Sequence, residues 1–85
     1  MKKSLTAATD QIILSFAALN RAADYLEAVG LERGSKFLRT SARKASDGSP
    51  ITGQDRKLAE TLIARARKGY DSLSTETKGL APDPN

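Results

Sequence analysis

The chain has 85 residues, and none of them is cysteine, histidine or tryptophan. Without cysteine, the chain can form no disulfide bond, no thiolate metal site and no thiol-based catalytic centre. Without histidine, it lacks the commonest zinc ligand and the usual general base near neutral pH. We therefore expect a protein that is not an enzyme and that carries no metal or cofactor.

Other catalytic patterns are equally poorly represented. Gly48 and Gly53 flank a helix start, but no Gly-Lys-Ser/Thr run comes after them, so a phosphate-binding loop is not predicted. Asp24 and Glu27 lie one helical turn apart, and a solvated helix face explains them better than a catalytic carboxylate pair does. These observations add to the expectation of a non-enzymatic protein.

Long apolar runs are also missing. The sequence opens with Met1-Lys2-Lys3, as many signal peptides do, but Thr6, Thr9 and Asp10 interrupt the apolar residues after it. A signal peptide needs an apolar run of roughly 7–15 residues, and a membrane span needs about 20. We therefore expect a cytoplasmic protein that does not interact with membranes.

Apolar residues do recur with helical periodicity, first over residues 4–29. One stripe falls within about 80° of the helix circumference at ~100° per residue, and it predicts the core-facing side. Its members are Leu5, Ile12, Phe16, Leu19, Ala23 and Leu26. A second stripe on nearly the opposite side comprises Leu14, Ala18, Tyr25 and Val29. It has two interpretations: a wide face for packing against two other helices, or a partner surface such as a homodimer interface.

Two further helices are predicted over residues 32–46 and 53–73. Gly30 and Gly48 have the position of left-handed glycines at helix C-termini, and Thr52 that of an N-cap residue. The fold class is therefore all-α: a compact three-helix domain over residues 1–80. The polar, proline-containing residues 81–85 are expected to form a disordered tail.

The positive charge is concentrated in one part of the chain. Residues 31–57 contain seven basic and three acidic residues, whereas basic and acidic residues balance on either side. The seven are Arg33, Lys36, Arg39, Arg43, Lys44, Arg56 and Lys57. Several are i, i+3 or i, i+4 neighbours on the second helix, where like charges repel by a few tenths of a kcal/mol. A bound polyanion would offset that repulsion.

Two functions are compatible with this cationic segment. The first is a small nucleic-acid-binding accessory or regulatory protein that contacts phosphates through the seven residues. The alternative is a compact protein-binding regulator or inhibitor, of the kind that phages and plasmids encode, whose basic face binds an acidic surface of a host protein. No aromatic residue is interleaved with the basic residues, so base stacking is only weakly supported and sequence-independent binding is favoured.

Overall fold

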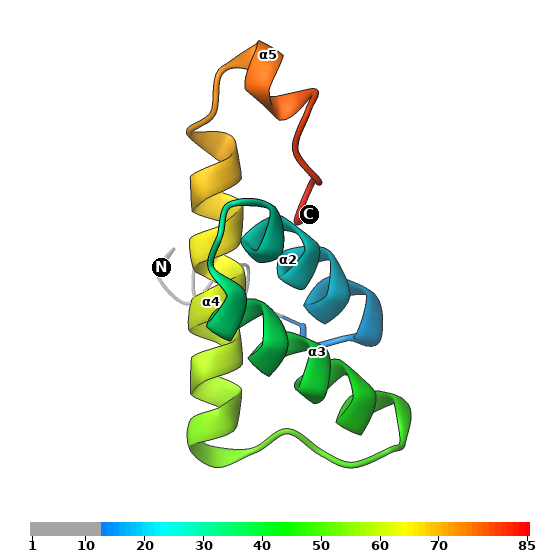
Figure 1. The fold of residues 1–85 in the computed structure, drawn as a ribbon. Coiled ribbons are helices and arrows are strands. Elements are labelled where there is room, and N and C mark those ends of the chain that lie inside the picture. Colours follow the sequence, from blue (N-terminus) through cyan, green and yellow to red (C-terminus); the bar gives the residue numbers. More distant parts are fainter. Residues whose placement is uncertain (1–12) are drawn as a thin grey trace, which may run out of the picture.

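The computed structural model describes residues 13–85, and the regular structure of that part is entirely helical (Figure 1). Its elements are α2 (Phe16–Ala28), α3 (Glu32–Ser46), α4 (Gly53–Asp71) and the short α5 (Thr75–Lys78). The predicted all-α fold with three main helices is confirmed. The longest of them is α4 with 19 residues, not the first helix as predicted.

The helix predicted over residues 4–29 is interrupted before Phe16, where α2 begins. Residues 13–15 are not helical, and Ser15 is the N-cap of α2, with its Oγ accepting a hydrogen bond from the Ala18 amide at 3.1 Å. The prediction of one continuous helix over residues 4–29 is therefore wrong. The spacing of apolar residues does not reveal that Ser15 caps a helix start. Leu5 and Ile12 of the predicted core stripe lie outside the described residues.

Glycines end α2 and α3 as predicted. Gly30 has a φ of 87° and Gly48 a φ of 85°, in the left-handed region that favours glycine. The Gly30 amide donates to the Glu27 carbonyl at 3.1 Å, and the Leu31 amide donates to the Leu26 carbonyl at 2.8 Å. This pair of bonds is the Schellman motif. It reverses the chain, so α3 runs antiparallel to α2.

The core lies where the α2–α3 pair crosses α4 (Figure 1). Leu19, Leu26, Leu38 and Ile63 are fully buried, and most of the remaining core residues are alanines. Small side chains let helix axes approach closely. The α2–α3 contact is the most extensive of the three helix pairs. Phe16 is the one described member of the predicted stripe that lies outside this core.

Two glycines allow close contacts between helices. A Cβ on Gly34 would lie 3.2 Å from Leu62 Cδ2 and 3.3 Å from Leu26 Cδ1, so α3 packs tightly at its start. A Cβ on Gly69 would lie 2.9 Å from the Tyr25 hydroxyl. Tyr25 therefore lies against the backbone of α4 and stacks edge-on with Tyr70 at 6.1 Å between ring centroids.

The prediction of a disordered C-terminal tail is wrong in this structure. Residues 81–85 fold back beside α2 (Figure 1), and Pro84 is fully buried. The Arg21 guanidinium donates to the Asn85 carbonyl at 3.2 Å, and Asp83 accepts from the Asn85 amide at 2.9 Å. Composition suggested disorder, but Pro84 is buried and Arg21, far away in the sequence, hydrogen-bonds Asn85.

Substituting Pro84 tests this ordered tail. Pro84→Ala removes two buried methylene groups, and we expect it to lower the free energy of unfolding by about 1–1.5 kcal/mol in urea denaturation. Pro50→Ala is the matched control, because Pro50 is exposed and both variants lose the same backbone restriction. Equal effects of the two substitutions would show that the tail does not pack.

Candidate nucleic-acid interface

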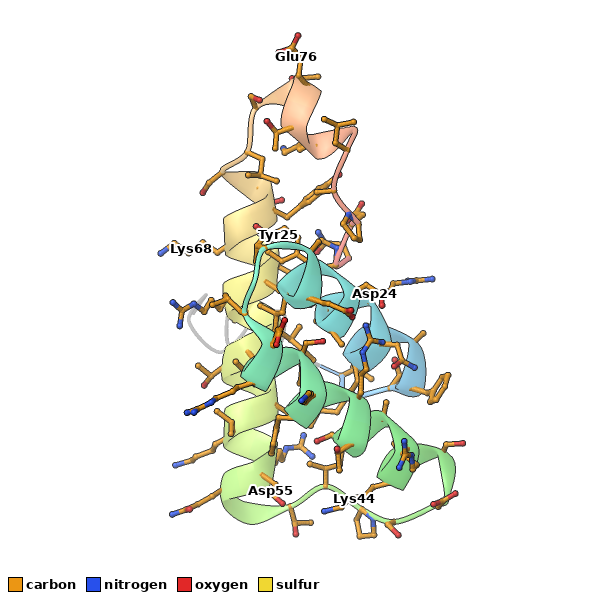
Figure 2. The ribbon with its side chains drawn as sticks, in the orientation of Figure 1. Asp24, Tyr25, Lys44, Asp55, Lys68 and Glu76 are labelled. Carbon is orange, nitrogen blue, oxygen red and sulfur yellow. The ribbon has the colours of Figure 1, made fainter. Side chains whose placement is uncertain are left out.

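The outward face of α3 carries most of the predicted basic residues. Leu38 and Ala42 are buried on the inward side of this helix. At 3.6 residues per turn, the opposite side is then occupied by polar residues. These are Arg33, Lys36, Thr40, Arg43 and Lys44, all of them exposed. We call Arg33, Lys36, Arg43 and Lys44 the α3 cations; Figure 2 labels Lys44 among them.

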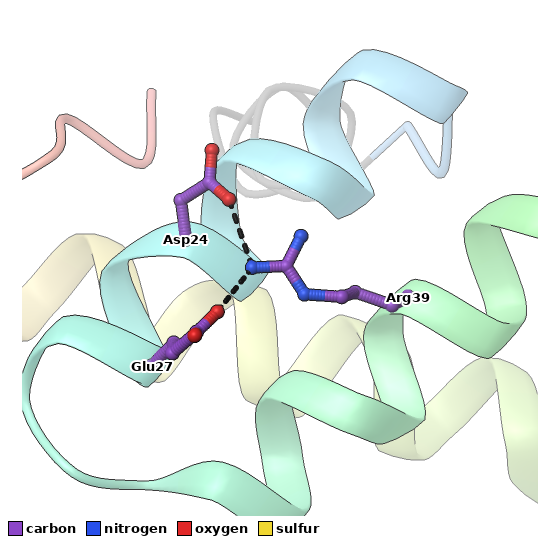
Figure 3. Close-up of polar contacts among 3 residues, drawn as sticks. All are labelled: Asp24, Glu27 and Arg39. Carbon is purple, nitrogen blue, oxygen red and sulfur yellow. Dashed lines mark hydrogen bonds and ion pairs between the residues drawn. The ribbon is translucent and has the colours of Figure 1, made fainter.

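Arg39 also lies on α3, but unlike the α3 cations its charge is already paired with acids. Its guanidinium reaches across to α2, where Nη2 lies 3.0 Å from Asp24 Oδ1 and also hydrogen-bonds Glu27 Oε1 (Figure 3). The hydrogen bond to Glu27 raises the pKa of Arg39 above its ordinary value, and the hydrogen bond to Asp24 adds a smaller effect in the same direction. The two acids therefore do more than form a solvated helix face: they compensate the charge of Arg39.

Two of the seven predicted basic residues, Arg56 and Lys57, lie on α4 and not on α3. Arg56 Nε lies 3.1 Å from Glu60 Oε2, one turn along the same helix. Lys57 is exposed on α4. The predicted cationic segment is thus divided: four cations share the outward face of α3, two arginines are paired with acids, and Lys57 belongs to another helix.

Two pockets lie between α2 and α3, and Arg39 lines both of them. We call them the two ends of the α2–α3 groove, and they differ chemically. The end near the Gly30 turn is lined by Glu27, Glu32, Ser35, Lys36 and Arg39, so it contains two acids and two bases. The opposite end is lined by Phe16, Asn20, Arg39, Ala42, Arg43 and Ser46, with no acid among them. An anion is therefore favoured at the second end.

Sequence reasoning did not identify Phe16 as a surface residue. Its position in the apolar stripe predicted burial, but 54% of its surface is exposed. Phe16 is the first residue of α2. The α3 residues that line the pocket beside it are Arg39, Ala42, Arg43 and Ser46. The N-cap position of Ser15 was the available signal, because it places Phe16 at a helix end, where fewer packing partners lie.

The predicted partner stripe on α2 does not form one continuous exposed surface. Tyr25 is 5% exposed and belongs to the core. Leu14 and Ala18 are half-buried, and Val29 is 45% exposed. Tyr25 therefore belongs to a packing face, as the first of the two interpretations of this stripe predicted. Homodimerisation through the stripe stays a prediction.

The described chain offers neither a cluster of metal ligands nor a membrane-spanning helix. Residues 13–85 contain no group of three or more acidic residues placed to hold a metal ion. No helix within the same range is long and apolar enough to cross a membrane.

The pairing of Arg39 with Asp24 and Glu27 can be tested by its contribution to the stability of the fold. Arg39→Ala should lower the free energy of unfolding by about 0.2–1 kcal/mol at low salt, the usual range for exposed ion pairs. The loss should shrink near 1 M NaCl, where the Debye length is about 3 Å. Arg43→Ala, which removes a cation of the same helix without an ion pair in residues 13–85, should change stability little. Equal, salt-independent losses would contradict this assignment.

Comparison with known proteins provides no further assignment. No protein-family model matches the sequence, and no match was found among curated proteins or solved structures. Any function must therefore be argued from the described residues themselves.

Proposed function

We propose that this chain is a non-enzymatic nucleic-acid-binding protein that contacts phosphates through the α3 cations. The strongest support for this proposal is that the α3 cations have no acidic partner in the described residues. Of the basic residues on α3, only Arg39 forms ion pairs with acids in residues 13–85, and the other four are exposed without one. Uncompensated cations on one helix face provide the electrostatic surface that a polyanion needs.

The length of this face is compatible with several phosphates. At a rise of 1.5 Å per residue, the helix advances about 16 Å from Arg33 to Lys44. One strand of a duplex places a phosphate every 3.4 Å along its axis, so about five phosphates pass over that distance. Four cations and the Thr40 hydroxyl could contact most of them.

The α3 cations have no reader of base sequence among them. Asparagine and glutamine, which pair with adenine through two hydrogen bonds, do not occur on α3. Lysine and arginine can contact guanine, but they bind phosphates equally well. We therefore propose binding that is largely independent of sequence.

An acidic surface of a host protein is the alternative partner for the same face. It would use the same cations, but its contacts would not show the counterion release that accompanies phosphate neutralisation. Salt dependence therefore separates the two partners.

Salt titration of binding to labelled oligonucleotides tests the proposal. Four phosphate contacts give a slope of log K against log salt of about −3.6 for a duplex and −2.8 for a single strand. Affinity should accordingly fall on the order of 50- to 150-fold between 50 and 200 mM salt. Replacing all four α3 cations by glutamine should abolish binding.

Single substitutions supply the matched comparison for this titration. Lys44→Gln should make the slope of log K against log salt less negative by about 0.7–0.9. Arg56→Gln should change the slope less, because the charge of Arg56 is already paired with Glu60. No binding to either oligonucleotide at low salt, or binding that survives the fourfold substitution, would contradict the proposal.

A further inference from the structure

We propose that the Phe16 end of the α2–α3 groove is a base-stacking site for single-stranded nucleic acid. The site would hold one unpaired base of a strand whose phosphates lie on the α3 cations. This inference rests on the proposed function and adds the class of nucleic acid and a residue outside the cationic segment.

Phe16 is the only aromatic side chain available for stacking in the described part of the chain. Tyr25 is buried, while Phe37 and Tyr70 are half-buried and pack against the core. Phe16 is 54% exposed at the start of α2. Exposing an aromatic ring to water is unfavourable, and a stacked base would remove that ring surface from water.

The neighbours of Phe16 suit a nucleotide. Arg43, one of the α3 cations, lines the same groove and can bind the phosphate beside a stacked base. Asn20 and Ser46 also line it, and their side chains can both donate and accept hydrogen bonds with the edge of a base. The pocket at this end has a volume of about 280 Å³. That is slightly below the ~300–1,000 Å³ of typical small-molecule pockets, as expected for one unit of a polymer.

The charge pattern along the groove favours the same end. At the end near the Gly30 turn, the charges of Glu27 and Glu32 offset those of Lys36 and Arg39, so a phosphate gains less there than beside Arg43. Arg39 lies between the two ends with its charge compensated by Asp24 and Glu27. A strand that runs along the α3 cations is therefore favoured at Arg43 and Phe16.

A single strand fits this arrangement better than a duplex does. Bases of a duplex are stacked on one another, so their faces are not available to Phe16, whereas an unpaired base can rotate outward. Every base has a π-face, so such stacking is tolerant of sequence. The site therefore agrees with sequence-independent binding.

A second copy of the chain is a less favourable occupant of this site. In a two-fold symmetric dimer, the same patch of both copies meets itself. Contact through Phe16 would then bring two copies of Arg43 close together, and juxtaposed like charges are unfavourable.

The test compares wild-type protein with Phe16 variants on a 12-nucleotide single strand and on the matching duplex. We expect wild-type protein to bind the single strand more tightly. Phe16→Ala should weaken single-strand binding about 5- to 150-fold without changing the salt slope. Phe16→Leu keeps an apolar side chain but not the ring, and should lose most of the same affinity, whereas Phe16→Tyr should retain it.

A fluorescent base gives a direct readout of stacking. A single strand that contains 2-aminopurine should lose fluorescence on binding wild-type protein, and much less on binding Phe16→Leu. The far-ultraviolet circular dichroism of each variant verifies that it is folded. Unchanged affinity and quenching with Phe16→Leu, or tighter binding of the duplex, would overturn the stacking site while leaving phosphate binding intact.

Two other results would overturn the stacking site for different reasons. If wild-type protein binds neither oligonucleotide at low salt, the proposed function fails and the stacking site fails with it. If wild-type protein sediments as a dimer that Phe16→Ala converts to a monomer, the groove is an interface between copies and the inference is overturned.

Discussion

Leu38 and Ala42 on α3, and Leu19 and Leu26 on α2, are buried at the contact that joins these two helices to α4. The Schellman motif at Gly30 reverses the chain and makes the two helices antiparallel. This packing fixes which side of α3 is turned away from the core, and hence which of its polar residues contact solvent. The charge distribution of the surface is a consequence of it.

The same packing divides the basic residues into two kinds. Arg39 lies on the flank of α3 nearest α2 and is compensated by Asp24 and Glu27, whereas the α3 cations form no ion pair within residues 13–85. At the other end of the groove, α2 begins at Phe16 and leaves its ring exposed beside Arg43. A basic face and an aromatic ring, which lie far apart in the sequence, thus become neighbours.

The parts of this structure that depend on local sequence were predictable. The bounds of α3, the left-handed glycines and the outward position of the α3 cations result from periodicity and capping. The features that depend on tertiary contacts were not. The ion pairs of Arg39, the exposure of Phe16 and the burial of Pro84 require knowledge of which helix lies opposite, and where it ends. Gly34 illustrates the difference: in the sequence it only weakens a helix, but in the structure its missing side chain leaves room for Leu62 and Leu26.

Both proposals place an anionic strand on the outward face of α3, from which it continues to the start of α2. Its position can be mapped from backbone amide chemical shifts by NMR during titration with a single-stranded oligonucleotide. We expect shifts concentrated at residues 33–46 and 16–20, with little change over residues 81–85. Shifts confined to α5 and residues 81–85, or the absence of any shift at low salt, would contradict this placement.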